Sequence, residues 1–343
     1  MKVIFSHNLP FALAHGGVQT QVEALMRELG ALGVAVEPER WWDAAQQADI
    51  LHYFGRPPTV GHVRQARLKG RRVVMFENLD QTASRSRPAL LAQRLLIRAA
   101  RATPGGLTNR LAWDCYGELD AMIYATSIEW DVAKYLFQAR HDRGHIIPQG
   151  IEARALEELQ APAPQEDYLV SVATITARKN SVLLAEAARI AQVPVLFLGR
   201  PYSEDDEYFR QFRALVDGKF VRHEGFVPEE VKFARLRSAR GFALLSQFES
   251  GCIAVHEAAA TGLPLLLPDL PWAARVYDGV ERARFVGLGS AEAVAGELAR
   301  FHSESRRGPG PTFHVLSWRA VAEAYLRVYQ TVLAPTPPER RVG

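Results

Sequence analysis

The sequence predicts an α/β protein with two parallel-sheet domains. The chain has 343 residues, about twice the length of a typical domain. Short apolar runs alternate with longer amphipathic stretches, a pattern typical of successive β-helix-β units. The pattern breaks near Ile147 and Pro148, crosses a stretch rich in Pro, Gln and Glu over 159–167, and then starts again. We expect the two domains to face a central cleft, because ligands bind at the carboxyl ends of parallel strands.

The first half begins with an apolar strand over 3–5. A helix is expected over 18–32, and Gly30 and Gly33 mark its end. Four further short apolar runs are expected to be strands, at 34–36, 50–54, 73–76 and 121–125. We assign residues 1–148 to the first domain.

The second half repeats this design. A strand at 168–173, a helix at 181–191 and a strand at 193–198 come first, followed by strands at 241–245 and 265–267 with a helix at 253–261 between them. We assign 149–315 to the second domain and expect a last helix over 316–333. The tail 334–343 contains three prolines and no apolar pattern, so we expect it to be disordered.

Composition excludes several classes of protein. The chain is 48% hydrophobic and 23% charged with a net charge of +3, which is ordinary for a soluble enzyme and does not indicate a nucleic-acid-binding protein. Cys115 and Cys252 are the only cysteines, too few for a disulfide framework or a cysteine-based zinc site. No signal peptide or membrane span is recognised, so we expect a cytoplasmic protein.

One segment is strongly basic. Residues 51–112 contain twelve Lys or Arg and two acidic residues. Within it, Arg94, Arg98 and Arg101 fall at helical spacing beside several leucines. A basic amphipathic helix can lie on an anionic membrane surface, at the inner face of the membrane in a cytoplasmic protein. A solvated outer face of a core helix would give the same pattern.

Common ligand motifs are absent from the sequence. There is no G-x-G-x-x-G, no P-loop and no G-x-S-x-G, and Ala260 replaces the second His of an H-E-x-x-H motif. With few clustered His and Cys residues, we expect no metal site and no cofactor.

The segment 246–264 carries the strongest chemical signal. Glu249 stands in an expected strand-to-helix loop, Gly251 would let the backbone approach a ligand, and Glu257 follows in the helix. The start of that helix presents unpaired N–H groups and a positive dipole end, which suit a phosphate. The spacing of the two glutamates is uninformative alone. Their setting between two strands is what supports a ligand-binding site in this segment.

This segment resembles the E-x7-E region of family 4 retaining glycosyltransferases, which have the GT-B fold with two Rossmann-like domains. The resemblance extends over nearly the whole chain. Its other motifs are the glycine-rich loop His15-Gly16-Gly17-Val18-Gln19, the interdomain linker 147–151, the diphosphate-binding segment 170–180, the base loop Gly225-Phe226-Val227 and a terminal helix that begins near Ser317 and crosses back to the first domain.

The resemblance implies transfer of a hexose from a UDP- or GDP-linked donor, with retention of configuration and without metal, as in polysaccharide biosynthesis. The acceptor, expected on the first domain, would be a glycan or a lipid-linked intermediate. Glu257 would hold the ribose and Glu249 the transferred sugar, and Gly225, Phe226 and Val227 the base. Residues implied at the diphosphate and sugar are Gly16, Gly17, Thr174, Arg178, Lys179, Ser250, Gly251, Cys252 and Ile253.

Two positions depart from the family pattern. Thr174 stands where the family often has an Arg, which leaves Arg178 as a substitute. The family often has a His after the central strand of the first domain, where this chain has Glu77 and Asn78. Glu77, Asn78 or, on the preceding strand, His52 would take that role.

Other functions remain compatible with the sequence. A glycoside hydrolase would use Glu249 and Glu257 as its acid and nucleophile. A nucleotide-sugar epimerase or a phosphorylase would use the same fold. A non-catalytic sugar- or nucleic-acid-binding module would use the basic surface, and its binding would weaken steeply with salt.

Overall fold

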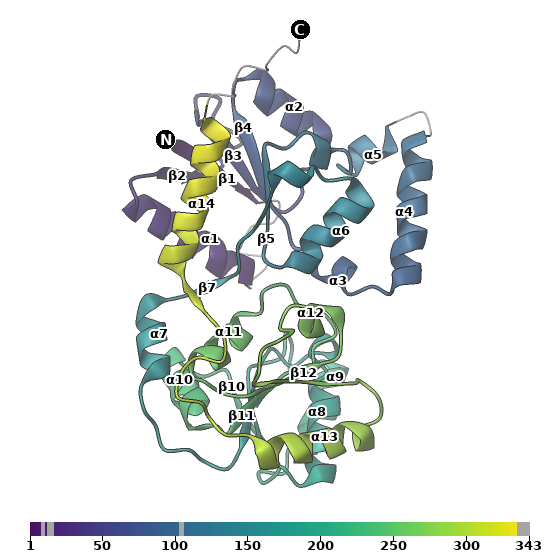
Figure 1. Cartoon of the computed structure of the whole chain (residues 1–343), viewed down its shortest axis with the longest axis vertical. Helices are drawn as coiled ribbons and strands as arrows, with labels where there is room; N and C mark the ends of the chain where they lie inside the picture. Colours follow the sequence, from purple (N-terminus) through teal and green to yellow (C-terminus); the bar gives the residue numbers. More distant parts are fainter. Residues whose placement is uncertain (8–10, 12–16, 103–105, 335–343) are drawn as a thin grey trace. The chain divides into compact units, whose positions relative to one another are not determined.

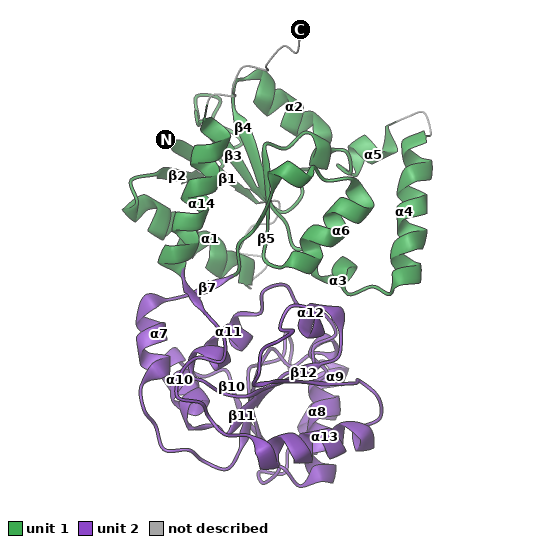
Figure 2. Ribbon diagram, viewed as in Figure 1, with its two compact units in different colours: residues 1–148, 318–343 green, residues 149–317 purple. Residues whose placement is uncertain are grey.

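The computed structural model describes residues 1–7, 11, 17–102 and 106–334. The chain divides into two compact units, coloured separately in Figure 2. Unit 1 comprises Met1–Pro148 and Trp318–Gly343, and unit 2 comprises Gln149–Ser317. Apart from Ala334, the tail for which we expect disorder lies outside the described residues.

Unit 1 contains a parallel sheet of six strands in the order β2-β1-β3-β4-β5-β6. The strands are β1 (Lys2–His7), β2 (Ala35–Pro38), β3 (Ile50–Phe54), β4 (Arg72–Phe76), β5 (Ala121–Tyr124) and β6 (Gly144–Ile146). The helices are α1 (Gly17–Ala31), α2 (Val60–Leu68), α3 (Asp80–Ala83), α4 (Arg87–Ala102), α5 (Leu107–Arg110), α6 (Ser127–Phe137) and α14 (Trp318–Leu333), with short 3-10 turns at Cys115–Gly117 and His141–Arg143.

Burial explains why the central strands of unit 1 are mostly apolar. All residues of β3 and β5 are buried, as expected when helices cover both faces of a parallel sheet. The last helix, α14, packs beside α1 (Figure 1). The amide of Gln21 in α1 donates to the hydroxyl of Tyr325 in α14 at 3.0 Å.

Unit 2 repeats the six-stranded parallel order as β10-β9-β8-β11-β12-β13. These strands are β8 (Leu169–Val172), β9 (Val195–Leu198), β10 (Val221–Gly225), β11 (Gly241–Ala243), β12 (Leu265–Pro268) and β13 (Ala283–Val286), and β7 (Gly150–Ile151) pairs with β14 (Leu316–Ser317). The helices are α7 (Ala153–Gln160), α8 (Ser181–Ala191), α9 (Glu207–Leu215), α10 (Glu229–Ser238), α11 (Ile253–Ala260), α12 (Pro271–Ala274) and α13 (Ala291–Glu304), with a 3-10 turn at Ala177–Lys179.

The predicted α/β class with two parallel sheets is confirmed. Each sheet reverses its strand order once, between β1 and β3 in unit 1 and between β8 and β11 in unit 2. Ligands of open α/β sheets bind outside the carboxyl ends of the strands at such a reversal. The strand order of unit 2 therefore directs attention to the loops that follow β8 and β11.

Candidate functional site

In unit 2, Lys179 and Glu249 come together at the reversal of strand order. Lys179 follows β8 and Glu249 follows β11, and these strands are neighbours in the sheet. The ammonium of Lys179 donates to Oε1 of Glu249. Nη1 of Arg178 lies 3.2 Å from the same oxygen. The structure thus brings together three of the residues for which the sequence predicts contacts with diphosphate and sugar.

The two loops hold each other in place. The amide of Asn180, whose φ is 52°, donates to the carbonyl of Leu245 at 2.8 Å. The backbone N–H of Gln247 donates to the carbonyl of Arg178 at 2.8 Å, and Nη1 of Arg178 donates to the carbonyl of Phe248 at 3.0 Å. These bonds fix the loops that carry Lys179 and Glu249.

The start of α11 lies beside this ion pair. Gly251 has a φ of 47°, a left-handed conformation that favours glycine. Cys252 is the N-cap residue, and its side chain forms no capping hydrogen bond. Burial raises the pKa of the Cys252 thiol to about 11, while the nearby charges of Glu249 and Lys179 raise and lower it. The thiol is therefore neutral, and Lys179 is close to the positive end of the helix.

The remaining residues predicted for the diphosphate lie on the same loops. Thr174 follows β8 and is half-buried, and Ser250 and Ile253 flank the turn into α11 and are also half-buried. In unit 1, Gly17 begins α1, whereas Gly16 lies outside the described residues.

Glu257 occupies the second turn of α11, where the sequence predicts a contact with ribose. Its side chain is buried, and Nζ of Lys232 in α10 lies 2.6 Å from its Oε1. Burial raises the pKa of Glu257, and the charge of Lys232 opposes this shift. Sequence reasoning missed Lys232, because nothing in a linear pattern relates α10 to α11.

The predicted base loop follows β10. Phe226 is 76% exposed, and the guanidinium of Arg200, after β9, lies 5.4 Å from the centre of its ring. The backbone N–H of Gly199 donates to the carbonyl of Gly225 at 2.7 Å. An exposed aromatic ring beside an arginine can stack on a planar base. Arg200 was also missed, although its place directly after a strand was a usable signal.

In unit 1, Glu77 follows β4 and is buried in an ion pair. Its Oε1 accepts from Nη2 of Arg56 at 2.8 Å and from Nε at 3.1 Å, and its Oε2 accepts from the hydroxyl of Tyr116. Asn78, the next residue, is exposed. Arg56 follows β3 as Glu77 follows β4, so the pair joins two neighbouring strand ends. Sequence reasoning missed this partner.

The suggestion that His52 contacts a sugar is wrong. The side chain is fully buried, and its Nδ1 lies 2.6 Å from the hydroxyl of Tyr329 in α14. Burial lowers the pKa of His52 to about 3. This histidine is a neutral core residue that joins β3 to α14.

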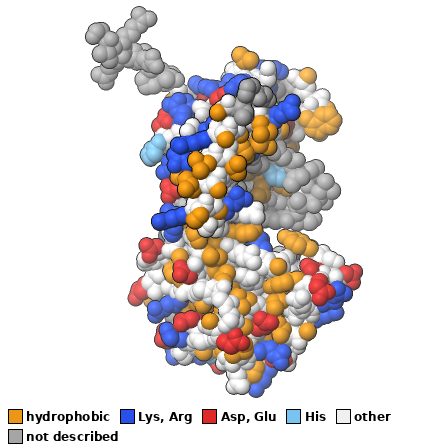
Figure 3. All heavy atoms as spheres, turned by 90° about the vertical axis from the view of Figure 1, so that its right-hand side faces the viewer, with side chains coloured by type: hydrophobic (Ala, Val, Ile, Leu, Met, Phe, Trp, Pro, Cys, Tyr) orange, Lys and Arg blue, Asp and Glu red, His pale blue; other side chains and the backbone are white. Residues whose placement is uncertain are grey.

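The predicted basic face of α4 is only partly present. Nε of Arg101 donates to Asp114 at 2.9 Å, and the guanidinium of Arg94 lies 4.3 Å from the centre of the Tyr135 ring. Arg98 is exposed. The exposed leucines of this helix are Leu91, Leu95 and Leu96, and Figure 3 shows hydrophobic and basic side chains together on this side of unit 1. No described helix is both long enough and apolar enough to span a bilayer.

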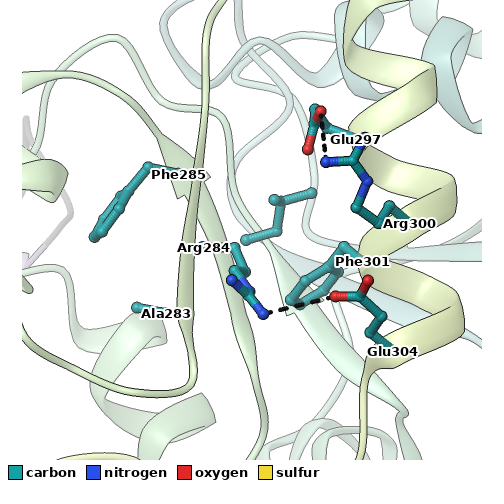
Figure 4. A pocket seen from close by; sticks show the side chains of 8 residues that line it. Ala283, Arg284, Phe285, Glu297, Arg300, Phe301 and Glu304 are labelled. Atoms are coloured by element: carbon teal, nitrogen blue, oxygen red, sulfur yellow. Dashed lines mark ion pairs between the residues drawn. The ribbon is translucent and has the colours of Figure 1, made fainter.

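A cavity of about 520 Å³ lies elsewhere in unit 2 (Figure 4). Two ion pairs line it, Arg284 with Glu304 at 3.6 Å and Arg300 with Glu297 at 3.5 Å. It is formed by β12, β13 and α13 and contains none of the predicted site residues.

The chain is similar in structure to several solved glycosyltransferases. Sucrose-phosphate synthase from Thermosynechococcus elongatus matches with a TM-score of 0.68 and 15% identity, covering 98% of this chain and 100% of that one. AviGT4, a glycosyltransferase of avilamycin A biosynthesis, matches with a TM-score of 0.61 and 18% identity, covering 98% of each chain. HepE from Anabaena, solved with UDP, matches with a TM-score of 0.64 and 13% identity, covering 97% and 98%.

Comparison at the level of sequence gives no assignment, since no family model and no curated protein matches the chain. The structural matches extend over nearly the full length of both partners. Together with the two six-stranded parallel sheets, they identify the fold of this chain as GT-B, the fold of these glycosyltransferases.

Proposed function

We propose that the protein is a retaining, metal-independent glycosyltransferase that moves a hexose from a UDP- or GDP-linked donor to a glycan or lipid-linked acceptor. The main support is the meeting of Lys179, Glu249 and the start of α11 at the reversal of strand order in unit 2. A compact cation and the start of a helix suit a diphosphate. The fold, which this chain shares with a protein solved with UDP, agrees with this proposal.

Donor binding would replace the ion pair between Lys179 and Glu249. The β-phosphate takes the ammonium of Lys179 and the N–H groups of Cys252 and Ile253 at the start of α11. Glu249, released from the lysine, accepts hydrogen bonds from the sugar hydroxyls, and charged acceptors form the stronger bonds. Arg178 remains near both and takes the place of the family arginine that Thr174 replaces.

The reaction breaks the bond between the anomeric carbon and the β-phosphate oxygen. The acceptor oxygen forms its bond to the same carbon on the same face, so the configuration is retained. The acceptor proton passes to the departing phosphate oxygen, and no protein nucleophile takes part. Lys179 and the helix start stabilise the charge that develops on the phosphate, which is usually the largest catalytic contribution.

In unit 1, we propose that Asn78 and Glu77 serve the transferred sugar, Asn78 by direct contact and Glu77 mainly by positioning Asn78. Asn78 is exposed and offers both a donor and an acceptor. Glu77 is already bonded to Arg56 and Tyr116, so it would act mainly by fixing the backbone that carries Asn78.

Thermal shift with UDP, GDP and ADP in the presence of EDTA tests the donor. Stabilisation by one nucleotide without metal supports the transferase, and absence of a shift with all three at millimolar concentration contradicts it.

The anomeric configuration of the product, read by NMR, tests retention. Release of sugar from a glycoside without nucleotide would indicate the hydrolase, and a new sugar on the same nucleotide would indicate the epimerase. Phosphate-dependent cleavage of a glycoside would indicate the phosphorylase.

We also propose that the protein is cytoplasmic and that α4 makes peripheral contact with the inner face of an anionic membrane. Leu91, Leu95 and Leu96 are 50%, 55% and 69% exposed, and Arg98 is exposed beside them. Apolar side chains together with an arginine suit an anionic lipid surface. Sedimentation with anionic and neutral vesicles tests this contact, with Leu95→Asp as the variant and Leu68→Asp, 79% exposed on α2, as the control. Equal sedimentation with both lipids contradicts it.

A further inference from the structure

The carboxylate of Glu257 is held by a lysine from a different helix. Glu257 lies in α11, and Lys232 lies in α10, which begins two residues after the base loop. The distance between Nζ of Lys232 and Oε1 of Glu257 is 2.6 Å, and the two side chains are 19% and 8% exposed. The described residues provide no hydrogen bond to Oε2 of Glu257, so that oxygen can accept one from a ligand.

The charges around this carboxylate explain why it needs a partner. Burial disfavours the ionised form of Glu257, and the exposed Glu229, whose Oε1 is 3.8 Å from Nζ of Lys232, adds a like charge. Lys232 is the opposing cation. A carboxylate that loses its proton in a buried position needs such a charge nearby.

The choice of lysine is informative in a chain where only six of 41 basic residues are lysines. Unit 2 contains three of them, Lys179, Lys219 and Lys232. Two of these three contact the two glutamates at positions 249 and 257. An ammonium is a compact charge that occupies one carboxylate oxygen, whereas a guanidinium tends to bind both. Lysine therefore leaves the second oxygen available.

We propose that Lys232 is a positioning residue for the ribose of the nucleotide. It binds Oε1 of Glu257, keeps the carboxylate ionised and turns Oε2 toward the 2′ and 3′ hydroxyls. This inference rests on the proposed function, because it requires a nucleotide in unit 2. Lys232 itself does not touch the ligand.

A comparison of nucleotides with and without these hydroxyls tests the proposal. Calorimetry at pH 7.5 would measure binding of UDP, GDP and their 2′,3′-dideoxy counterparts to the full chain and to Lys232→Met. We expect Lys232→Met to bind the preferred nucleotide about tenfold more weakly, a change of about 1.4 kcal/mol. Its affinity for the dideoxy form should equal that of the unchanged protein. Lys219→Met, which replaces an exposed lysine of the same unit, serves as the control, with affinities unchanged.

The pH dependence adds a readout that a merely structural ion pair would not give. In Lys232→Met, affinity for the ribonucleotide should rise with pH as Glu257 ionises, and it should vary less in the unchanged protein. Lys232→Arg keeps the positive charge, so it should recover part of the affinity that Lys232→Met loses. This comparison separates the effect of lost charge from the effect of a folding defect. Equal weakening of the ribonucleotide and dideoxynucleotide, or no weakening at all, would overturn the role of Lys232. Failure of the unchanged protein to bind UDP or GDP would overturn the proposed function itself.

Discussion

Lys179 and Glu249 form an ion pair across the two strands at which the sheet of unit 2 reverses its order. Each would have its own part of a nucleotide sugar to bind, so their pairing in the free protein keeps both side chains in place without a ligand. This arrangement predicts opposite effects on nucleotide affinity when one or the other partner is removed.

Replacement of Lys179 should weaken nucleotide binding without unfolding the protein. In Lys179→Ala, Arg178 remains 3.2 Å from Glu249, so the carboxylate keeps a cationic partner. Loss of a charged hydrogen bond costs about 1.5–3 kcal/mol, which corresponds to a tenfold to hundredfold loss of UDP or GDP affinity by calorimetry. Circular dichroism would confirm the fold, and unchanged affinity would remove Lys179 from the diphosphate site.

Replacement of Glu249 should separate nucleotide binding from turnover. Glu249→Gln frees Lys179 and removes a negative charge near the diphosphate, so affinity for the free nucleotide should stay the same or increase. Turnover with the nucleotide sugar should fall at least about a hundredfold, because the amide is a weaker acceptor for the sugar hydroxyls. A parallel loss of nucleotide affinity and turnover would show that Glu249 does not act on the sugar.

The adjacent residues Glu77 and Asn78 should differ in their effect on stability. Glu77→Leu leaves Arg56 without its carboxylate, and we expect a loss of about 3 kcal/mol in the free energy of unfolding. This is the lower end for a broken buried pair, because the Arg56 side chain keeps 25% exposure. Asn78, which is exposed, should cost less stability when replaced by Ala, while turnover decreases. Tyr116→Phe should be intermediate, with a loss of about 1 kcal/mol in the free energy of unfolding. Urea denaturation of the three variants would show whether their losses of stability follow this order.

The repeated strand pattern was enough to predict an α/β protein with two parallel sheets, whereas the GT-B fold was predicted from the family resemblance. The strands β3, β4 and β5 are mostly apolar and mostly buried, and β3 has the bounds expected from the sequence. The outer strand β10 reads Val-Arg-His-Glu-Gly and was not foreseen, because a partly exposed edge strand has no apolar run. The order of the strands in each sheet could not be predicted from the sequence, because apolar patterning does not specify which strands are neighbours.

The candidate site was predicted less completely than the fold. Glu249 could be found from its place in a loop between a strand and a helix, and Lys179 from the resemblance of segment 170–180 to a diphosphate-binding segment. The partners of Glu257 and Glu77, which are Lys232 and Arg56, could not be found in this way. Those pairs depend on side chains from separate elements, and their sequence separation carries no periodic signal. His52 was misjudged for a related reason, because its partner Tyr329 is 277 positions away.

Two buried histidines should make the protein sensitive to acid. Burial lowers the pKa of His52 to about 3 and that of His256 to about 4. Below the usual histidine pKa near 6.5, the unfolded chain binds protons that the folded protein does not, so stability falls as pH decreases. Each histidine contributes a slope of about 1.4 kcal/mol per pH unit, from about pH 6 down toward its folded pKa.

Urea denaturation between pH 4.5 and 7 measures this slope. His52→Phe should reduce it by the contribution of one histidine, although loss of the bond to Tyr329 lowers stability at neutral pH. His62→Gln, which changes an exposed histidine of the same unit, should leave the slope unchanged. A slope unaffected by His52→Phe would contradict the assignment of His52 as a neutral core residue.

Gly199 should be the least replaceable glycine of unit 2. A Cβ added there would lie 2.0 Å from the carbonyl oxygen of Ala173, and the φ of 142° is itself unfavourable for other residues. Gly199→Ala must therefore push apart the ends of β8 and β9, which carry Thr174 and Arg200. We expect a loss of about 2–4 kcal/mol in the free energy of unfolding together with weaker nucleotide binding. Gly17→Ala is the control and should retain full stability, because no atom lies within 4 Å of the added carbon. Equal stability of Gly17→Ala and Gly199→Ala would show that the fold does not require the close approach at Gly199.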